Sequence, residues 1–175
     1  MTNNHTLKLY RYGSPILKKR AEEVTEFDGE LHEFIDRMAD TLYTQNGVGL
    51  AAPQVGLSRR IFIVDLSFGE EVERVLPMIN PEILSVEGSC SMEEGCLSIP
   101  GVYEDIVRPE KVWIRYWDPD GREREIEADD FLARIIQHEA DHLDGILFVD
   151  RLGSVKRSLL SKTLRGIAES ENGEE

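Results

Sequence analysis

The stretch from Asp129 to Leu143 constrains the fold more than any other part of this chain. It reads DDFLARIIQHEADHL, contains neither Gly nor Pro, and consists mostly of residues with good helix propensity. One continuous stripe at helical spacing contains Phe131, Ile135, His138 and His142. A second apolar stripe lies beside it, so the pattern predicts a mostly buried helix with both histidines facing inward. We expect Asp129 or Asp130 to cap its start and Gly145 to follow its end.

The same stretch contains the motif HExxH, in which His138 and His142 lie four residues apart and Glu139 follows the first histidine. Residues four apart lie on one face of a helix, one turn from each other, so these two imidazoles can bind one divalent metal. Glu139 would then lie close enough to handle protons on a water molecule at that metal. Two histidines hydrogen-bonded inside a core would leave the same pattern, so the motif alone does not decide.

The class of such a site depends on a third ligand, which the motif does not supply. In the extended zinc-protease pattern HExxHxxGxxH a third histidine follows, but this chain has Phe148 at that position. Asp144 and Asp150 are near in sequence, although both read as turn residues. The two cysteines, Cys90 and Cys96, are too few for a disulfide framework and are better considered as ligands. Position favours Cys96, although a free cysteine is usually just a small buried residue.

Length and composition predict one globular domain. The chain has 175 residues, of which 41% are hydrophobic and 31% charged, as in an ordinary globular protein. The net charge of −14 argues against broad binding to DNA, other nucleic acids or anionic membranes. The first residues, MTNNHTLKLYRYG, lack an apolar signal core, and no apolar run approaches membrane-spanning length. We therefore expect a cytoplasmic protein with no membrane segment.

The remaining pattern predicts a mixture of helices and strands. Residues 30–43 read as an amphipathic helix with Asp28 as its cap, and residues 154–168 read as a last helix capped by Ser154. Strands are expected at 7–10, 60–66 and 78–84, and a hairpin is expected at 111–117 and 122–128 around the turn sequence DPDG. Residues 85–105 are neither helix-like nor cleanly alternating, and residues 169–175 are expected to form a disordered tail.

Three short motifs together resemble the bacterial peptide deformylase family. They are GVGLAAPQ at 47–54, EGCLS at 94–98 and QHEADH at 137–142, in the order of that family, and the sequence IPGVYEDIVRP after Cys96 also fits. The resemblance extends over essentially the whole chain, and no motif position departs from it. It implies that residues 1–175 form one catalytic α+β domain, in which antiparallel β-strands pack around a central metal-bearing helix and a C-terminal helix follows.

The resemblance also implies a role for each motif residue. The metal ligands would be Cys96, His138 and His142. A fourth position would remain for water, as in catalytic rather than structural metal sites. Glu139 would be the general base, and the oxyanion of the reaction would be stabilised by the side-chain amide of Gln54 and the backbone N–H of Leu97. The substrate would bind along Gly49, Glu94 and Gly95.

The implied reaction is the hydrolytic removal of the formyl group from the N-terminal formylmethionine of newly made polypeptides, with release of formate. The family uses Fe²⁺ and also works with Zn²⁺, Ni²⁺ or Co²⁺, whereas the ligand set alone would favour zinc. A pocket for the methionine side chain is suggested independently of the family. Phe131 and Ile135 lie on the stripe that carries the histidines, so we expect them to line it.

Two other classes of protein remain open on the sequence. An ordinary HExxH metallopeptidase would cleave internal peptide bonds. A non-catalytic domain with a structural zinc would need four protein ligands, so Cys90 would have to join the set.

The last predicted helix carries a basic patch on an otherwise acidic chain, made of Lys156, Arg157, Lys162 and Arg165. Such a patch could bind the ribosome through RNA phosphates, which would hold the protein near its nascent substrates. A solvated face of an amphipathic helix would show the same pattern.

Overall fold

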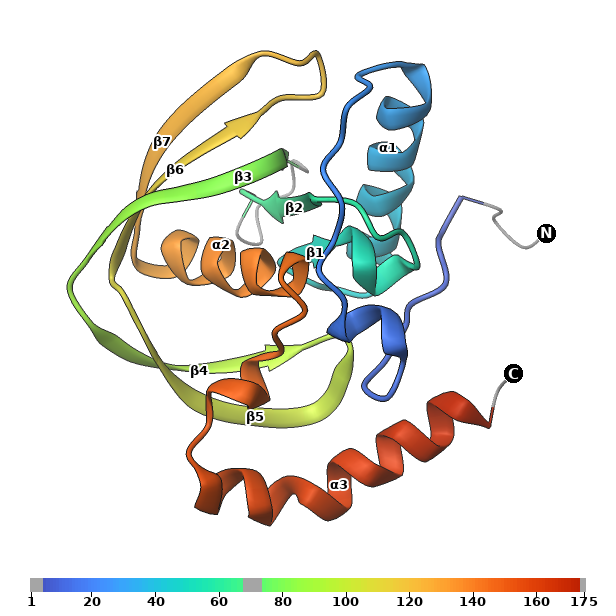
Figure 1. The fold of residues 1–175 in the computed structure, drawn as a ribbon, viewed down its shortest axis with the longest axis vertical. Helices are drawn as coiled ribbons and strands as arrows, with labels where there is room; N and C mark the ends of the chain where they lie inside the picture. The colour runs from blue at the N-terminus through green and yellow to red at the C-terminus, as the bar shows by residue number, and fades with distance from the viewer. Residues whose placement is uncertain (1–4, 68–73, 174–175) are drawn as a thin grey trace.

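The computed structural model describes residues 5–67 and 74–173 (Figure 1). The α-helices in these ranges are α1 (Gly29–Thr44), α2 (Asp130–Leu143) and α3 (Ser154–Asn172). Short 3₁₀ helices are η1 (Pro15–Lys18), η2 (Ala52–Val55) and η3 (Phe148–Arg151). The strands are β1 (Gly49–Ala51), β2 (Ile61–Asp65), β3 (Val75–Glu87), β4 (Cys90–Cys96), β5 (Ile99–Arg108), β6 (Lys111–Trp117) and β7 (Glu123–Asp129).

Five of these strands form an antiparallel sheet in the order β1-β2-β3-β6-β7. Register shifts in the β3–β6 pairing, between Ile79 and Glu82 and between Ile83 and Ser85, interrupt the ladder where β3 curves around α2 (Figure 1). Strands β4 and β5 pair separately and form a two-stranded ribbon, which we call the β4–β5 ribbon. The predicted α+β class, with antiparallel strands around a central helix, is confirmed.

Strand β2 lies between α2 and α1, and all five of its residues are buried. Successive side chains of a strand point to opposite faces. Phe62 therefore packs into the core cluster that contains Ile136 of α2, whereas Ile63 packs into the cluster that contains Met38 of α1. Burying each such side chain stabilises the fold by roughly 1.5–3 kcal/mol. Helix α2 is thereby held rigidly from one side and leaves its other face for the β4–β5 ribbon.

The predicted α1 and its cap are confirmed, because the Asp28 side chain accepts a hydrogen bond from the Leu31 N–H at 3.0 Å. For α2 the predicted cap position is confirmed but the side-chain bond is not formed, and the predicted cap of α3 is wrong. Asp129 occupies the N-cap position of α2 without a side-chain cap bond, and Gly153 rather than Ser154 precedes α3. Gly145 follows α2 with a positive φ of 72°, the conformation that suits glycine after a helix.

The predicted hairpin is confirmed as β6 and β7, but the strand expected at 7–10 and the disordered tail expected from residue 169 are wrong. Residues 7–10 do not form a strand, although the Tyr10 N–H donates to the Gln54 carbonyl. Residues 85–105, which fit no simple pattern, supply most of the β4–β5 ribbon. Helix α3 continues to Asn172, so residues 169–172 are not a disordered tail, and residues 174–175 lie outside the described ranges. Within the described ranges, no helix combines the length and apolarity that crossing a bilayer requires.

Candidate metal centre

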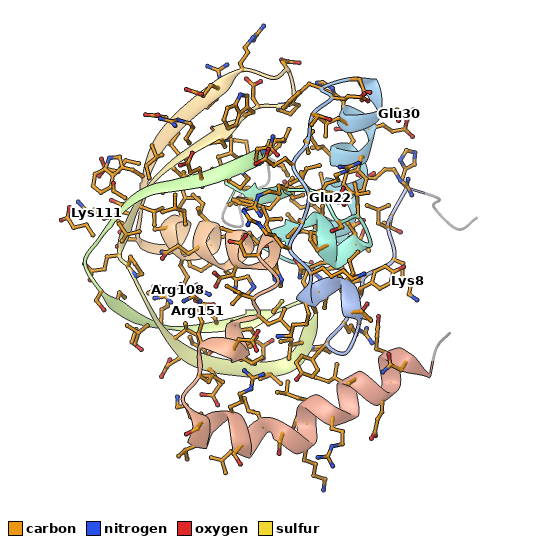
Figure 2. All side chains as sticks on the ribbon, in the orientation of Figure 1. Lys8, Glu22, Glu30, Arg108, Lys111 and Arg151 are labelled. Carbon is orange, nitrogen blue, oxygen red and sulfur yellow. The ribbon has the colours of Figure 1, made fainter. Side chains whose placement is uncertain are left out.

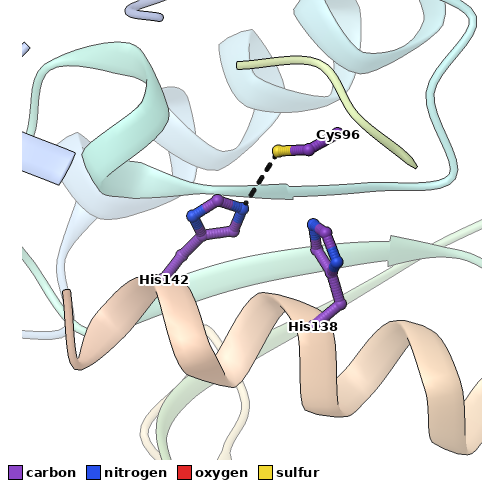
Figure 3. Close-up of side chains that lie close together, drawn as sticks. All are labelled: Cys96, His138 and His142. Carbon is purple, nitrogen blue, oxygen red and sulfur yellow. Dashed lines mark hydrogen bonds between the residues drawn. The ribbon is translucent and has the colours of Figure 1, made fainter. Parts of the chain in front are cut away.

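Helix α2 and the end of β4 bring three potential metal ligands together. His138 and His142 project from the same face of α2, and Cys96 is the last residue of β4 (Figure 3). One ligand atom from each of these residues lies within 4.8 Å of the other two. The Sγ atom of Cys96 lies 3.4 Å from Nε2 of His142.

These positions fit one tetrahedral metal ion. With metal–sulfur and metal–nitrogen bonds of about 2.3 and 2.1 Å, the S···N edge of a tetrahedron is about 3.6 Å. The observed separation of Cys96 and His142 matches that edge. A thiolate and two imidazoles also form a donor set that suits a divalent transition metal.

The ring of His138 is oriented by Glu94. Its Nδ1 lies 2.9 Å from Oε2 of Glu94, so the ring donates its Nδ1 proton and directs Nε2 towards the site. Burial opposes ionisation of Glu94, but hydrogen bonds from His138 and Arg108 hold the pKa of this carboxyl far below its usual range. Burial likewise opposes a charge on His138, yet its contacts with Cys96 and Glu94 raise the His138 pKa well above the usual value.

Glu139 lies beside these ligands and is almost fully buried. Burial raises the pKa of its carboxyl to about 7. Its Oε2 atom has no hydrogen-bond partner among the described residues. A buried carboxyl oxygen without a partner normally carries a large free-energy cost, so its presence points to a group that the protein itself does not supply.

The backbone of β1 approaches Glu139 closely at Gly49. A Cβ atom at this position would lie 2.6 Å from Oε1 of Glu139 and 2.9 Å from Cγ2 of Ile135. Only a glycine leaves enough room there for both side chains.

Gln54 lies beside Cys96, in η2, and is also buried. Its Oε1 accepts from the Ala51 N–H at 2.9 Å, which fixes the amide with its nitrogen towards Cys96. The Nε2 group donates to Oγ of Ser98 at 3.1 Å and lies 3.5 Å from Sγ of Cys96. A side-chain N–H donor is therefore held next to the ligand atoms.

A cleft of about 520 Å³ opens onto this group of residues. It is lined by several residues that the sequence predicted for the site, namely Gly49, Gln54, Glu94, Gly95, Cys96, Leu97, Phe131, Ile135, His138 and Glu139. Phe131 is 42% exposed at the rim, whereas Ile135 is buried deeper. Glu94 contributes to the wall, but both of its carboxylate oxygens are bound by protein groups.

The alternative ligands considered from the sequence are engaged elsewhere. The Phe148 ring, at the position of the third histidine in the extended pattern, stacks beside His138 with centroids 6.0 Å apart. Asp144 accepts from Arg60, and Asp150 accepts from the Leu147 N–H and from Lys18. Neither carboxylate belongs to the cluster of possible ligands found in the described residues.

Sequence reasoning missed a second group of functional candidates, which we call the charged cluster. It consists of Glu94, Arg108, Arg134, Asp141 and Arg151. Arg108 donates to the carboxylates of Glu94 and Asp141. Arg151 also binds Asp141, and Figure 2 shows Arg108 and Arg151 between α2 and the β4–β5 ribbon. The signal was available, because Arg134, His138 and Asp141 follow the helical spacing i, i+4 and i+7 and therefore share one face.

A Cys-His-His group at the floor of an open cleft, beside a buried glutamate and held by an antiparallel α+β fold, defines a metal-binding hydrolase.

The chain belongs to the peptide deformylase family, because the family model described as polypeptide deformylase matches residues 6–158. The peptide deformylase of Thermodesulfovibrio yellowstonii is 46% identical over 159 residues, which cover 91% of this chain and 96% of that protein. The peptide deformylase of Wolinella succinogenes is 49% identical over 162 residues, which cover 91% and 95%. The crystal structure of a peptide deformylase from Legionella pneumophila aligns with a TM-score of 0.87 at 39% identity, over 95% of this chain and 98% of that one.

The enzyme is accordingly a metal-dependent hydrolase that removes the formyl group from the N-terminal formylmethionine of newly made polypeptides and releases formate. The metallopeptidase and structural-zinc alternatives are not favoured.

Proposed function

We propose that Cys96, His138 and His142 hold one divalent metal, and that in the cell this metal is Fe²⁺. The observation that carries the proposal is their mutual spacing beside Glu139, whose buried Oε2 has no partner within the described ranges. Zn²⁺, Ni²⁺ or Co²⁺ would fit the same sulfur and nitrogen ligands. Three protein ligands leave a further coordination position for water or substrate, which suits catalysis.

Glu139 is the proposed general base and acid. A divalent metal at this site supplies a Lewis acid that makes water a nucleophile near neutral pH. As the water oxygen forms a bond to the formyl carbon, Glu139 takes the released proton. When the C–N bond breaks, Glu139 returns that proton to the departing amine, so formate and a free N-terminus result. A carboxyl whose pKa is raised to about 7 suits both transfers.

Gln54 and Leu97 are the proposed donors to the oxyanion that forms on the formyl oxygen. The Gln54 amide is fixed by its bonds to Ala51 and Ser98, so little reorganisation is needed when charge develops. The backbone N–H of Leu97 follows Cys96 directly along the chain, and Leu97 lines the same cleft.

The substrate is proposed to extend along Gly49 and Gly95, with its methionine side chain between Phe131 and Ile135. The ring of Tyr103 lies against Gly95, where a Cβ atom would come within 2.6 Å of it.

Glu94 has a different proposed role from the one inferred by resemblance. Its oxygens bind His138, Arg108 and Arg134, so it orients a metal ligand rather than the substrate.

The test is formate release from formyl-Met-Ala-Ser by anaerobically purified protein. We expect Glu139→Ala to lower the turnover by a factor of about 10²–10⁴ while it keeps its metal, because the base is removed and the ligands are not. The metal content of both proteins is measured at the same time. An active Glu139→Ala variant would contradict the assignment of the base.

The identity of the metal is tested on protein purified without oxygen from unsupplemented cells. We expect about one iron per chain by elemental analysis, and loss of tight binding in Cys96→Ser. Cys90→Ser is the matched control, because Cys90 lies six residues back along the ribbon, about 20 Å away for an extended strand. A stoichiometric zinc content in such preparations would contradict the iron assignment.

We further propose that the enzyme works in the cytoplasm as a single catalytic domain and docks on the ribosome through α3. Helix α3 carries exposed Lys162 and Arg165 and two exposed apolar residues, Val155 and Leu159. Lys156 and Arg157 are partly engaged by Glu104 and Asp150, so Lys162 and Arg165 are the better candidates for phosphate contacts.

Docking is tested by co-sedimentation with ribosomes at increasing salt. We expect Lys162→Glu/Arg165→Glu to reduce binding and to flatten its salt dependence, because fewer phosphate contacts release fewer counterions. Lys111→Glu/Arg122→Glu, on the β6–β7 hairpin, is the charge-matched control and should bind as wild type. Equal loss of binding in both double variants would refute specific docking through α3.

A further inference from the structure

Arg134 connects α2 with both strands of the β4–β5 ribbon through one buried guanidinium. Its Nη1 group donates to the Ile106 carbonyl of β5 at 2.7 Å and to Oε1 of Glu94 at 2.9 Å. Its Nη2 group donates to the Cys90 carbonyl of β4 at 2.9 Å. The side chain is only 5% exposed, so these bonds are made away from bulk water. Arg134 therefore ties the helix that carries two proposed metal ligands to the ribbon that carries the third.

The contact with Glu94 is shared between two successive turns of α2. Arg134 binds Oε1 of Glu94, and His138, four residues further along the same face, binds Oε2 at 2.9 Å. Glu94 in turn precedes Cys96 by two residues on β4. The position of Glu94 is therefore defined jointly by an arginine and by a proposed metal ligand.

Backbone pairing does not fix this part of the ribbon by itself. The register of β4 on β5 is regular from Cys90 to Glu94 and shifts between Glu94 and Cys96. At such an irregularity the ladder of backbone hydrogen bonds is locally disrupted and the strand bends. The side-chain bonds of Glu94 lie directly at this point.

We infer that Arg134 is a positioning residue that seats the β4–β5 ribbon on α2 and thereby sets the spacing of the Cys96 sulfur and the His138 ring. The inference rests on the proposed metal site. Removing one partner of a buried ion pair is costly when it leaves the other charge unpaired, but Glu94 keeps Arg108 and His138 as partners when Arg134 is replaced. Arg134 is on this view retained for the geometry of the site rather than for stability.

The test compares Arg134→Met and Arg134→Lys with wild type, starting from metal-free protein. Co²⁺ affinity is measured by competition with a chromophoric chelator, and the Co²⁺ absorption spectrum reports the thiolate and the coordination geometry. We expect Arg134→Met to bind Co²⁺ about 10–100-fold more weakly, with a shifted spectrum, as for other residues that orient metal ligands. We expect kcat on formyl-Met-Ala-Ser to fall more than KM rises. Arg134→Lys, which can reach fewer of the three acceptors, should recover part of the affinity.

Arg60→Met is the matched control, because Arg60 also donates from a mostly buried position to α2, through the Leu143 carbonyl and Asp144 at its far end. It should alter thermal stability without changing Co²⁺ affinity or spectrum. Wild-type affinity and spectrum in Arg134→Met would overturn the inference, whatever its Tm. If Arg134→Met does not fold, Arg134→Lys decides by the same two measurements.

A wrong assignment of the metal ligands can be distinguished from a wrong role for Arg134. Cys96→Ser should abolish the sulfur-to-cobalt band, which shows that the spectrum reads the proposed ligands. An unchanged band in Cys96→Ser would refute the site and, with it, the role of Arg134.

Discussion

Helices α2 and α3 are comparable in length and both mix apolar with charged residues, but they use them in opposite ways. Ten of the 14 residues of α2 are buried, and these include two histidines, Glu139, Arg134 and Asp141. In α3 only Leu164 and Glu171 of 19 residues are buried, whereas Val155 and Leu159 are 73% and 78% exposed. Figure 1 shows α2 inside the curved strands and α3 along the edge of the molecule.

The difference shows that each helix carries residues that are unusual for their surroundings: α2 buries polar side chains, and α3 exposes apolar ones. A buried polar group is costly unless it is bound, so the polar residues of α2 point to an internal site where nearly all of them are paired. A single exposed apolar residue is common on protein surfaces, but two at helical spacing beside basic residues suit an outer contact. We therefore expect the catalytic site on the buried face of α2 and the contact with a partner along the exposed face of α3.

The largest expected effect of this contrast is on the free energy of unfolding. Ile136 of α2 is fully buried in the core cluster against the sheet. We expect Ile136→Ala to lower the free energy of unfolding by about 2–5 kcal/mol, because it removes buried methyl groups and leaves a cavity. Urea unfolding of the metal-free protein measures this. A loss below about 1 kcal/mol would mean that α2 is packed less tightly than its burial indicates.

The close approach of β1 to α2 gives the next largest effect. Gly49→Ala would place a methyl group 2.6 Å from Oε1 of Glu139, so the carboxyl must move. We expect kcat/KM for formyl peptides to fall about 100-fold, as for other displacements of about 1 Å in an active site. Gly29→Ala at the start of α1 is the control, because its Cβ meets nothing within 4 Å. Full activity in Gly49→Ala would argue against Glu139 as the base.

A smaller effect concerns the proton on Glu139. Burial raises the pKa of this carboxyl to about 7 in the metal-free chain, so the group is mostly protonated at pH 6 and mostly ionised above pH 8. A cation bound nearby favours the carboxylate and expels the proton. We expect metal binding at pH 6 to release up to about one proton more from wild type than from Glu139→Gln, with no difference above pH 8.

This difference is measured by titration calorimetry in two buffers with different ionisation enthalpies. Equal proton release from both proteins at pH 6 would show that Glu139 is already ionised without metal.

The smallest effect is expected on α3. Leu159→Ala should change the free energy of unfolding by less than about 0.5 kcal/mol, because the side chain is largely exposed already. Activity on formyl-Met-Ala-Ser should also be unchanged. A loss of stability close to that of Ile136→Ala would erase the distinction between the two helices.

The parts of the fold that the sequence predicted are those with a local pattern. The stripe through Ile135, His138 and His142 identified α2 and its inward face, and the turn sequence DPDG identified the β6–β7 hairpin. Both follow from side-chain periodicity within a single element. The proposed ligand Cys96 could not be paired with the histidines by periodicity, since it is distant in sequence; its position only favoured it, and the family motifs joined the three residues.

The β4–β5 ribbon was missed for a physical reason. Its buried positions include Glu94 and Arg108, which break the alternation of apolar and polar residues that marks a half-buried strand. These two charges are satisfied by each other and by residues of α2, so the pattern makes sense only after the chain has folded. The same long-range pairing concealed the strand members of the charged cluster, whereas its α2 members share one helical face.

The distance along the chain between the proposed ligands has a consequence for the abundance of the enzyme in the cell. Cys96 and His142 are 46 positions apart, so the two segments that carry them meet only when the chain is folded. A metal that binds only the folded chain stabilises it by mass action, by about 2.7 kcal/mol when the free ion exceeds its Kd 100-fold. Starvation for that ion would therefore enlarge the unfolded population open to proteases. The abundance of this enzyme, and not only its turnover, would follow the metal supply.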